Sequence, residues 1–168
     1  MGLVIQATHG PLQHFLATIS IMRYLIGSLI SVYLLDLGLG GNSLKGEIPP
    51  SIFSLRKLRA LYLDSNKLTG KIPESLGQLK HLTDLNLTNN SLSGPIPSSI
   101  GNLSHLVGLQ LSENQFNGTI PKTLGLLSNL EELSIGNNIL TGTVNERHFT
   151  KFSKLTDLDI LIHICTLM

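Results

Sequence analysis

A motif of 24 residues recurs along most of this chain, and a fixed period of that length constrains the fold more than any single residue does. The stretches that end at Leu82, Leu106 and Leu130 share one outline of leucine, asparagine, glycine and Ile-Pro. Aligned on the period, they give the template L-x-x-L-x-L-x-x-N-x-L-x-G-x-I-P-x-x-L-G-x-L-x-x. Four copies follow this template between residues 34 and 129.

The repeat also divides the chain. A fifth copy starts at Leu130 with Asn145 in place of the proline, and an incomplete sixth copy starts at Leu155. No coil of this length can bury its leucines alone, so at least about three coils must stack. We expect a non-repeat apolar segment over residues 1–33, a repeat domain over residues 34–160 with about five coils and a partial sixth, and a truncated end over residues 161–168.

Each part of the template has a physical reason. The L-x-L alternation predicts a short strand with one buried face. The L-G-x-L part is too short for an α-helix and predicts a 3₁₀ turn or a single helical turn. Each proline should lie where the sheet needs no N–H donor. The predicted fold class is an α/β repeat, a solenoid with a parallel β-sheet on its concave face.

One asparagine per coil should form a ladder along the solenoid. A carboxamide both donates and accepts, so it can satisfy turn backbone groups that lack strand partners. The ladder residues are Asn42, Asn66, Asn90, Asn114 and Asn138.

The variable positions of the strands form the candidate binding surface, because they face solvent on the concave side. They include several acids and no lysine or arginine, so a partner should be neutral or basic there. The alternative is that they are ordinary solvated strand residues. The predicted contacts are Tyr62, as a rigid aromatic anchor, with Asp64, Asp84, Asn86 and Gln110.

Four N-x-S/T sequons are candidates for glycosylation, at Asn86, Asn89, Asn102 and Asn117. Asn89 and Asn102 should lie on exposed turns and are the favoured acceptors. A glycan on Asn86 would cover the concave face, so Asn86 cannot be both a protein contact and a glycosylation site.

A metal site is not expected from the histidines. His81 and His105 are 24 residues apart and should lie on neighbouring coils. Their column continues as Lys57, Asn129 and Lys154, which is typical of an exposed polar stripe.

Catalytic chemistry is not expected either. Asp157 and Asp159 share a strand face without a nucleophile, general acid or pocket. Cys165 has no paired base and is interpreted as a packing substitute for leucine, and a single cysteine excludes an internal disulfide. The net charge of +1 gives no argument for nucleic acid. We therefore predict a non-enzymatic chain with no cofactor and no metal.

Residues 1–33 allow three explanations. The uncharged run from Tyr24 to Leu35 follows Arg23 and is similar to the apolar region of a signal peptide or anchor, although no clear cleavage site follows. A degenerate capping coil and read-through of non-coding sequence are the alternatives.

The tandem L-x-G-x-I-P copies from residue 34 to about residue 160 resemble plant-type extracellular leucine-rich repeats. A shorter match resembles a variant of receptor-like proteins and consists of Gly142, Val144, Glu146, His148 and Phe149. The resemblance implies a right-handed solenoid, display at the cell surface or secretion to the apoplast, and recognition of a protein or peptide ligand or a co-receptor in defence or development.

The chain departs from that family in its caps. The cysteine-paired capping segments cannot form, and neither a kinase domain nor a transmembrane helix follows the repeats, so we expect a truncated relative or a gene fragment. Membrane association would require missing segments or the N-terminal one. Two functional alternatives remain beside a receptor-like recognition module: a soluble inhibitor of secreted pathogen hydrolases, and a fragment with no independent function.

Overall fold

The computed structural model describes residues 3–6, 33–142 and 152–160. The predictions for residues 7–32, for the receptor-like variant between residues 143 and 149, and for Cys165 lie outside these ranges.

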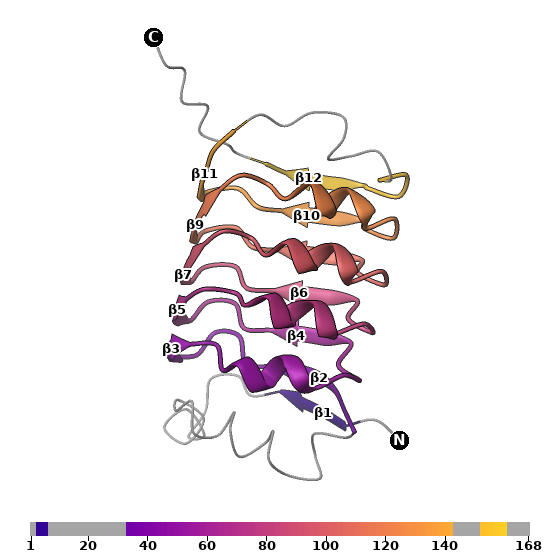
Figure 1. Cartoon of the computed structure of the whole chain (residues 1–168). Coiled ribbons are helices and arrows are strands. Elements are labelled where there is room, and N and C mark those ends of the chain that lie inside the picture. The colour runs from indigo at the N-terminus through magenta and orange to yellow at the C-terminus, as the bar shows by residue number, and fades with distance from the viewer. Residues whose placement is uncertain (1–2, 7–32, 143–151, 161–168) are drawn as a thin grey trace.

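Parallel strands, one per coil, form the main sheet and stack along the solenoid from β1 to β12 (Figure 1). In sheet order they are β1 (Leu3–Gln6), β2 (Leu34–Gly38), β4 (Ala60–Tyr62), β6 (Asp84–Asn86), β8 (Gly108–Gln110), β10 (Glu132–Ser134) and β12 (Asp157–Asp159). From β2 to β12 the strands of the main sheet pair with the same register, so Leu109 lies opposite Leu85 on one side and Leu133 on the other. The predicted solenoid with a parallel sheet is confirmed.

The first strand comes from the non-repeat segment. β1 pairs in parallel with β2, with a register shift between Leu3 and Val4, so that Val4 lies opposite Asp36. The three explanations for residues 1–33 stay predictions, because residues 7–32 are outside the described part of the chain.

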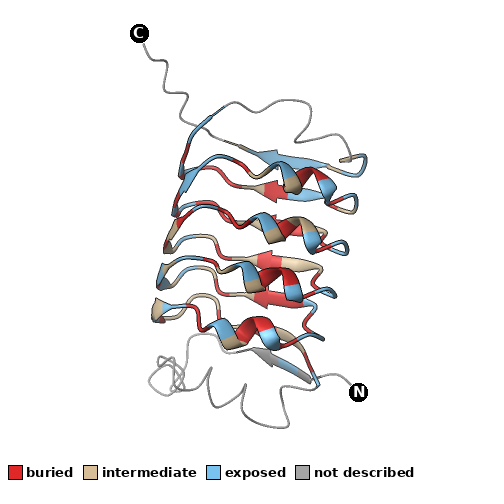
Figure 2. Ribbon diagram, viewed as in Figure 1, coloured by how far each residue is buried: buried red, intermediate tan, exposed pale blue. Residues whose placement is uncertain are grey.

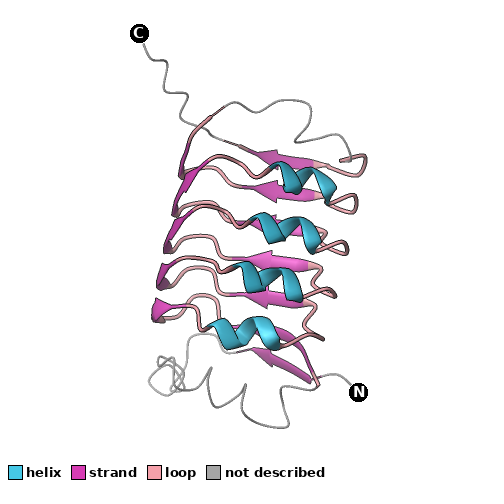
Figure 3. Cartoon of the chain, in the orientation of Figure 1, coloured by secondary structure: helices cyan, strands magenta, loops and turns pink. Residues whose placement is uncertain are grey.

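The return path of each coil has a second strand and a short helix (Figure 3). The second strands are β3 (Lys45–Glu47), β5 (Lys67–Gly70), β7 (Ser91–Gly94), β9 (Gln115–Gly118) and β11 (Ile139–Leu140). The helices, all 3₁₀ as predicted, are η2 (Pro50–Ser54), η3 (Glu74–Gln78), η4 (Ser98–Asn102) and η5 (Lys122–Leu126). A proline in extended conformation precedes each helix, where its missing N–H costs no sheet hydrogen bond.

One apolar core runs through the whole stack, between the main sheet and the helices (Figure 2). The strand leucines Leu61, Leu85 and Leu109 are at most 1% exposed. Phe116 takes a leucine position of the template and is also fully buried. The 24-residue period therefore places the same side chain of every coil in the same part of the core.

Two glycines let neighbouring 3₁₀ helices approach closely. A methyl group at Gly101 would overlap the backbone carbonyl of Thr123, and one at Gly77 would lie 2.7 Å from the Cβ of Ser99. Glycine is therefore needed at these two positions of the L-G-x-L part, because a larger residue would clash with the next coil.

The asparagine ladder is present, and Asn114 shows its pattern. Its Oδ1 accepts the N–H of Leu92 at 3.0 Å, and its Nδ2 lies within 3.2 Å of the carbonyl oxygens of Leu87, Leu111 and Ser112. Each carboxamide thus joins two coils through backbone groups. The same set of contacts is made by Asn66, Asn90 and Asn138.

The residue before each ladder asparagine adopts a left-handed conformation, which the template did not reveal. Ser65, Asn89, Glu113 and Asn137 have φ between 51° and 57°. This geometry turns the N–H groups of Ser65, Asn89 and Glu113 toward the next coil, as in the 2.8 Å bond from Ser65 to the carbonyl of Thr88. The inter-coil hydrogen bond offsets a local strain of about 1–2 kcal/mol.

Candidate recognition face

Side chains on the outer face of the main sheet form two rows that cross the solenoid; we call this surface the sheet face. Strand register alone determines which residues are neighbours. The first row is Asp36, Ala60, Asp84, Gly108, Glu132 and Asp157. The second row is Gly38, Tyr62, Asn86, Gln110, Ser134 and Asp159.

The structure brings most of the predicted contact residues together. Tyr62, Asn86 and Gln110 are successive members of the second row. Asp84 lies in the first row, on the same strand as Asn86. Asp64 lies beyond the end of β4 and leans toward the preceding coil. Their binding role stays a prediction.

Two acidic side chains on or beside the sheet face, those of Asp64 and Asp159, lie over glycines of adjacent coils. An added Cβ at Gly40 would be 2.5 Å from Oδ1 of Asp64, and one at Gly136 would be 2.6 Å from Oδ1 of Asp159. A side chain in place of either glycine would push the carboxylate away from the sheet. Because these glycines have no side chain, the carboxylates can lie close to the backbone of the adjacent coil.

Two carboxylates converge above Gly108. An added Cβ there would lie 3.1 Å from Oδ1 of Asp84 and 4.0 Å from Oε2 of Glu132, so these two oxygens are no more than 7.1 Å apart. The hydroxyl of Thr83 lies 2.7 Å from Oδ2 of Asp84, and Nε2 of Gln110 donates to Oε2 of Glu132 at 3.2 Å. Both acids are thus oriented by neighbours, one on each side of Gly108 in the first row.

The distal end of the sheet face is held by hydroxyl groups. The Oγ atoms of Ser112 and Ser134 are 2.6 Å apart, and Ser134 donates to Oδ2 of Asp159 at 2.9 Å. Oγ of Ser112 also lies 3.2 Å from Oδ2 of Asp159, so both serine hydroxyls are within hydrogen-bond distance of this carboxylate oxygen. These contacts join β10, β12 and the segment that follows β8, and they orient Asp159.

Tyr62 lies in the field of the surrounding acids. Partial burial raises the pKa of its phenol above 10.0, and the negative charges of Asp84, Asp36 and Glu132 raise the pKa further. The phenol therefore stays neutral at physiological pH and keeps its O–H donor.

We expect the substitution Asp84→Asn to lower the pKa of Tyr62 without restoring its ordinary value, because burial is the larger cause of the shift. The measurement is the pH titration of tyrosinate absorbance, with Tyr62→Phe as the reference that subtracts Tyr24 and Tyr33. The control Glu113→Gln removes a charge from an exposed turn and should leave the titration unchanged. An unaltered Tyr62 titration in Asp84→Asn would disprove the acidic field.

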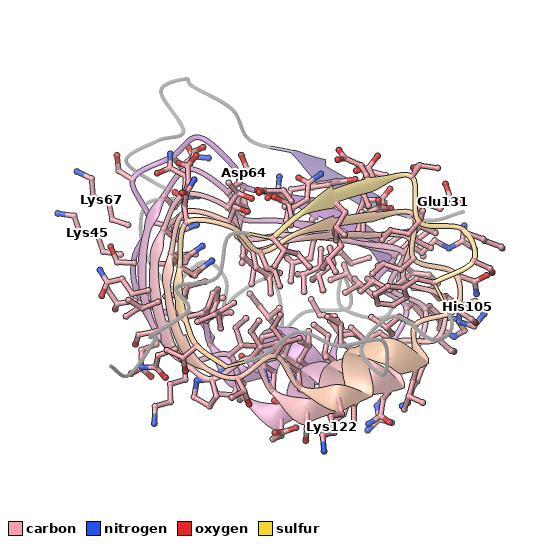
Figure 4. The ribbon with its side chains drawn as sticks, turned by 90° about the horizontal axis from the view of Figure 1, so that it is seen from above. Lys45, Asp64, Lys67, His105, Lys122 and Glu131 are labelled. Carbon is pink, nitrogen blue, oxygen red and sulfur yellow. The ribbon has the colours of Figure 1, made fainter. Side chains whose placement is uncertain are left out.

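Basic side chains lie on the other sides of the coil. Seen along the solenoid, Asp64 is on the sheet side, Lys45 and Lys67 are on the flank of the second strands, Lys122 is beside the helices, and His105 is on the opposite flank (Figure 4). Neither lysine nor arginine occurs in the two described rows, whereas both rows contain acids. The sheet face is therefore the acidic side of the described chain.

The four sequon asparagines occupy different surroundings. Asn89 is exposed on a turn, Asn102 is exposed at the end of η4, and Asn117 is exposed in β9. Asn86 is half-buried on the sheet face, where its Oδ1 accepts the N–H of Thr88 at 3.0 Å. Glycosylation at any of them stays a prediction.

Sequence reasoning missed the part played by Gly40, Gly108 and Gly136. These glycines occupy variable positions of the 24-residue template, but the spacing does not connect them with the acids that lean over them. Glu132 was in the same set and was not selected, although it shares the space above Gly108 with Asp84. Two acids separated by one small residue along a row would have been the signal, and finding it requires aligning successive coils position by position.

Comparisons with known proteins agree with this architecture. The family model described as leucine-rich repeat region matches residues 17–167. No curated protein matched the sequence. No helix in the described ranges is both long and apolar enough to cross a lipid bilayer.

Several solved structures are similar. The leucine-rich-repeat ectodomain of the plant membrane receptor kinase GASSHO1/SCHENGEN3 from Arabidopsis thaliana, in complex with CASPARIAN STRIP INTEGRITY FACTOR 2, is 42% identical, with a TM-score of 0.77 over 80% of this chain and 16% of that chain. The plant peptide hormone receptor RGFR1 in complex with RGF2 is 32% identical, with a TM-score of 0.76 over 79% of this chain and 21% of that chain. The ectodomain of the receptor kinase SOBIR1 from Arabidopsis thaliana is 33% identical, with a TM-score of 0.70 over 79% of this chain and 73% of that chain.

The chain thus spans only 16% and 21% of the first two receptors. The predicted resemblance to plant extracellular leucine-rich repeats is confirmed by the family match and by these ectodomains. This chain belongs to the leucine-rich-repeat family and is similar to parts of plant receptor ectodomains.

Proposed function

We propose that the sheet face is a non-catalytic recognition surface for a peptide or protein segment, in a receptor-like protein at the cell surface or in the apoplast. The observation that carries this proposal is the pair of oriented carboxylates above Gly108, beside the carboxamides of Asn86 and Gln110. A basic side chain of the ligand would enter between Asp84 and Glu132. The carboxamides can pair with the backbone of an extended ligand, because each both donates and accepts.

The structural neighbours support a peptide ligand. RGFR1 is described as a plant peptide hormone receptor in complex with RGF2, and the GASSHO1/SCHENGEN3 ectodomain was solved with CASPARIAN STRIP INTEGRITY FACTOR 2. Tyr62 would provide an aromatic anchor next to Asn86 in the same row, as tyrosine often does at interfaces. A co-receptor is a second partner of the proposed receptor-like protein.

The test uses a random peptide library displayed on phage, selected against the immobilised folded chain. We expect the selected peptides to be enriched in lysine or arginine. A synthetic selected peptide should lose about tenfold in affinity with Asp84→Asn or Glu132→Gln, which is ~1.4 kcal/mol in each case. Isothermal titration calorimetry measures the loss.

A substitution that keeps every charge gives a sharper test. Gly108→Ala places a methyl group between the two carboxylates, 3.1 Å from Oδ1 of Asp84, and should also weaken binding. The charge control is Glu113→Gln, whose exposed side chain is on a turn away from both rows. Selected peptides that lack basic residues, or that bind all these variants equally, would contradict the proposal.

The two alternatives predict other outcomes. A soluble inhibitor of secreted hydrolases would inhibit a microbial hydrolase in a stoichiometric assay and would not select short peptides. A fragment with no independent function would aggregate or melt without cooperativity, because uncovered solenoid ends expose apolar side chains.

A further inference from the structure

The two histidines of the coil flank lie side by side. His81 follows η3 and His105 follows η4, each in the turn that leads to the next strand of the main sheet. Their ring centroids are 6.1 Å apart, with the ring planes tilted by 41°. Both side chains are exposed, so solvent ions reach them freely.

A hydrogen bond determines the tautomer of His105. Its Nδ1 is 2.9 Å from the carbonyl oxygen of Lys80. A carbonyl oxygen only accepts, so Nδ1 carries the proton and Nε2 of the neutral ring keeps its lone pair. Histidines that bind metals almost always donate their other ring N–H to a carbonyl or carboxylate, as His105 does.

The same bond between coils recurs one coil later. Nδ2 of Asn129 donates to the carbonyl oxygen of Ser104 at 2.8 Å, over the same separation of 25 residues. The flank therefore has a repeated position that holds a side chain by one N–H group against the preceding coil. The remaining ring nitrogen of His105 is left for a ligand.

We propose that His81 and His105 form a two-imidazole site for a divalent transition-metal ion of the Zn²⁺ and Cu²⁺ class, with water completing the coordination. The sequence pattern argued against a metal because the column continues as lysine and asparagine, but a pair of coils is sufficient for two ligands. No group of three or more His, Cys, Asp or Glu ligands occurs within the described residues, which is why water must supply the rest.

The distances are compatible with such a site. Two imidazoles on one tetrahedral ion have ring centroids roughly 5 Å apart when each metal–nitrogen bond is about 2.0–2.1 Å. The rings at 6.1 Å must therefore approach by about 1 Å, which exposed side chains can do by rotation. The ammonium group of Lys80 donates a hydrogen bond to the carbonyl oxygen of Asn102 at 3.3 Å. Imidazole ligands favour Cu²⁺ over Zn²⁺, so Cu²⁺ should bind more tightly.

Binding would join the coil that contains η3 to the coil that contains η4. An ion that binds the folded chain raises its thermal midpoint by mass action. The effect should be local, because each coil of a repeat protein contacts only its neighbours.

The test titrates ZnCl₂ and, separately, CuCl₂ into the full chain by calorimetry, and measures the thermal midpoint with and without each metal. The variants are His81→Asn and His105→Asn. At position 105 asparagine should preserve the hydrogen bond to the preceding coil, as Asn129 does one coil later. We expect each variant to lose one binding site, with at least about a tenfold loss of affinity and loss of the metal-induced midpoint shift. His9, His14, His148 and His163 are unchanged in every variant, so their contribution cancels.

A gain of binding gives the second arm. Asn129→His should create a further pair with His105 and raise the affinity or the stoichiometry. Nitrogen-15 spectra of the unmodified chain should show the Nδ1–H tautomer of His105 and a metal-dependent shift of Nε2 in both histidines. Equal Zn²⁺ and Cu²⁺ affinity, stoichiometry and midpoint shift in the parent and both asparagine variants would overturn the proposal.

Discussion

The substitution Leu109→Ala is expected to lower the free energy of unfolding by about 3–5 kcal/mol, the usual cost of removing a fully buried leucine side chain. Leu109 is 0% exposed, and its register neighbours Leu85 and Leu133 are each 1% exposed. The cavity would lie in the middle of the stack, where coils on both sides hold the walls in place. For a chain of this size the thermal midpoint should fall by roughly 6–20 °C.

The matched control is Leu158→Ala. Leu158 occupies the same register position on β12 but is 48% exposed, so its loss removes less apolar contact. We expect less than about 1.5 kcal/mol for this variant, in proportion to its smaller burial. Urea unfolding followed by circular dichroism measures both values. Equal losses at the two positions would mean that the leucine stack does not carry the stability of the solenoid.

Replacing Asn114 by alanine should cost about 2–4 kcal/mol, because the change leaves the buried N–H of Leu92 without an acceptor and removes the Nδ2 donor from three carbonyl groups. Asn114 is 9% exposed, so water cannot easily replace these bonds. The loss should also uncouple neighbouring coils, since the carboxamide bonds to backbone of two coils. A lower slope of unfolding free energy against urea would report such uncoupling.

Asn117→Ala is the control for this prediction. Asn117 is the same residue type, three positions further along the chain, and its side chain is exposed in β9. We expect a change within about 0.5 kcal/mol, as for ordinary surface substitutions. If Asn114→Ala and Asn117→Ala had the same urea midpoint, the asparagine ladder would contribute nothing measurable to the free energy of unfolding. The leucine core would then account for the association of the coils.

Much of the fold could be predicted because a solenoid repeats one local solution. The spacing of Leu61, Leu85 and Leu109 places each of them in the same environment. A structure predicted correctly for one coil therefore holds for the other coils. The 3₁₀ helices, the parallel sheet and the asparagine ladder followed from the template and are present in the structure. The left-handed residue before each ladder asparagine was missed, because Ser65, Asn89 and Glu113 share no side-chain chemistry that marks it.

The site was only partly predictable. The positions of Tyr62, Asn86 and Gln110 in one row follow from the period alone. The convergence of Asp84 and Glu132 above Gly108 does not, because it depends on where each carboxylate turns once a neighbouring hydroxyl or carboxamide binds it.

The sequence by itself determined the coil, its leucine core, its asparagine ladder and the acidic character of the strand face, since each of these repeats with the 24-residue period. Only the tertiary structure determined which carboxylates lie over Gly40, Gly108 and Gly136. It also determined which ring nitrogen of His105 carries the proton. It also placed the N-terminal strand β1 beside β2, which no leucine pattern indicated. The physical reason is that periodicity specifies which residues are stacked, whereas rotamers and hydrogen-bond partners depend on contacts between different residues of adjacent coils.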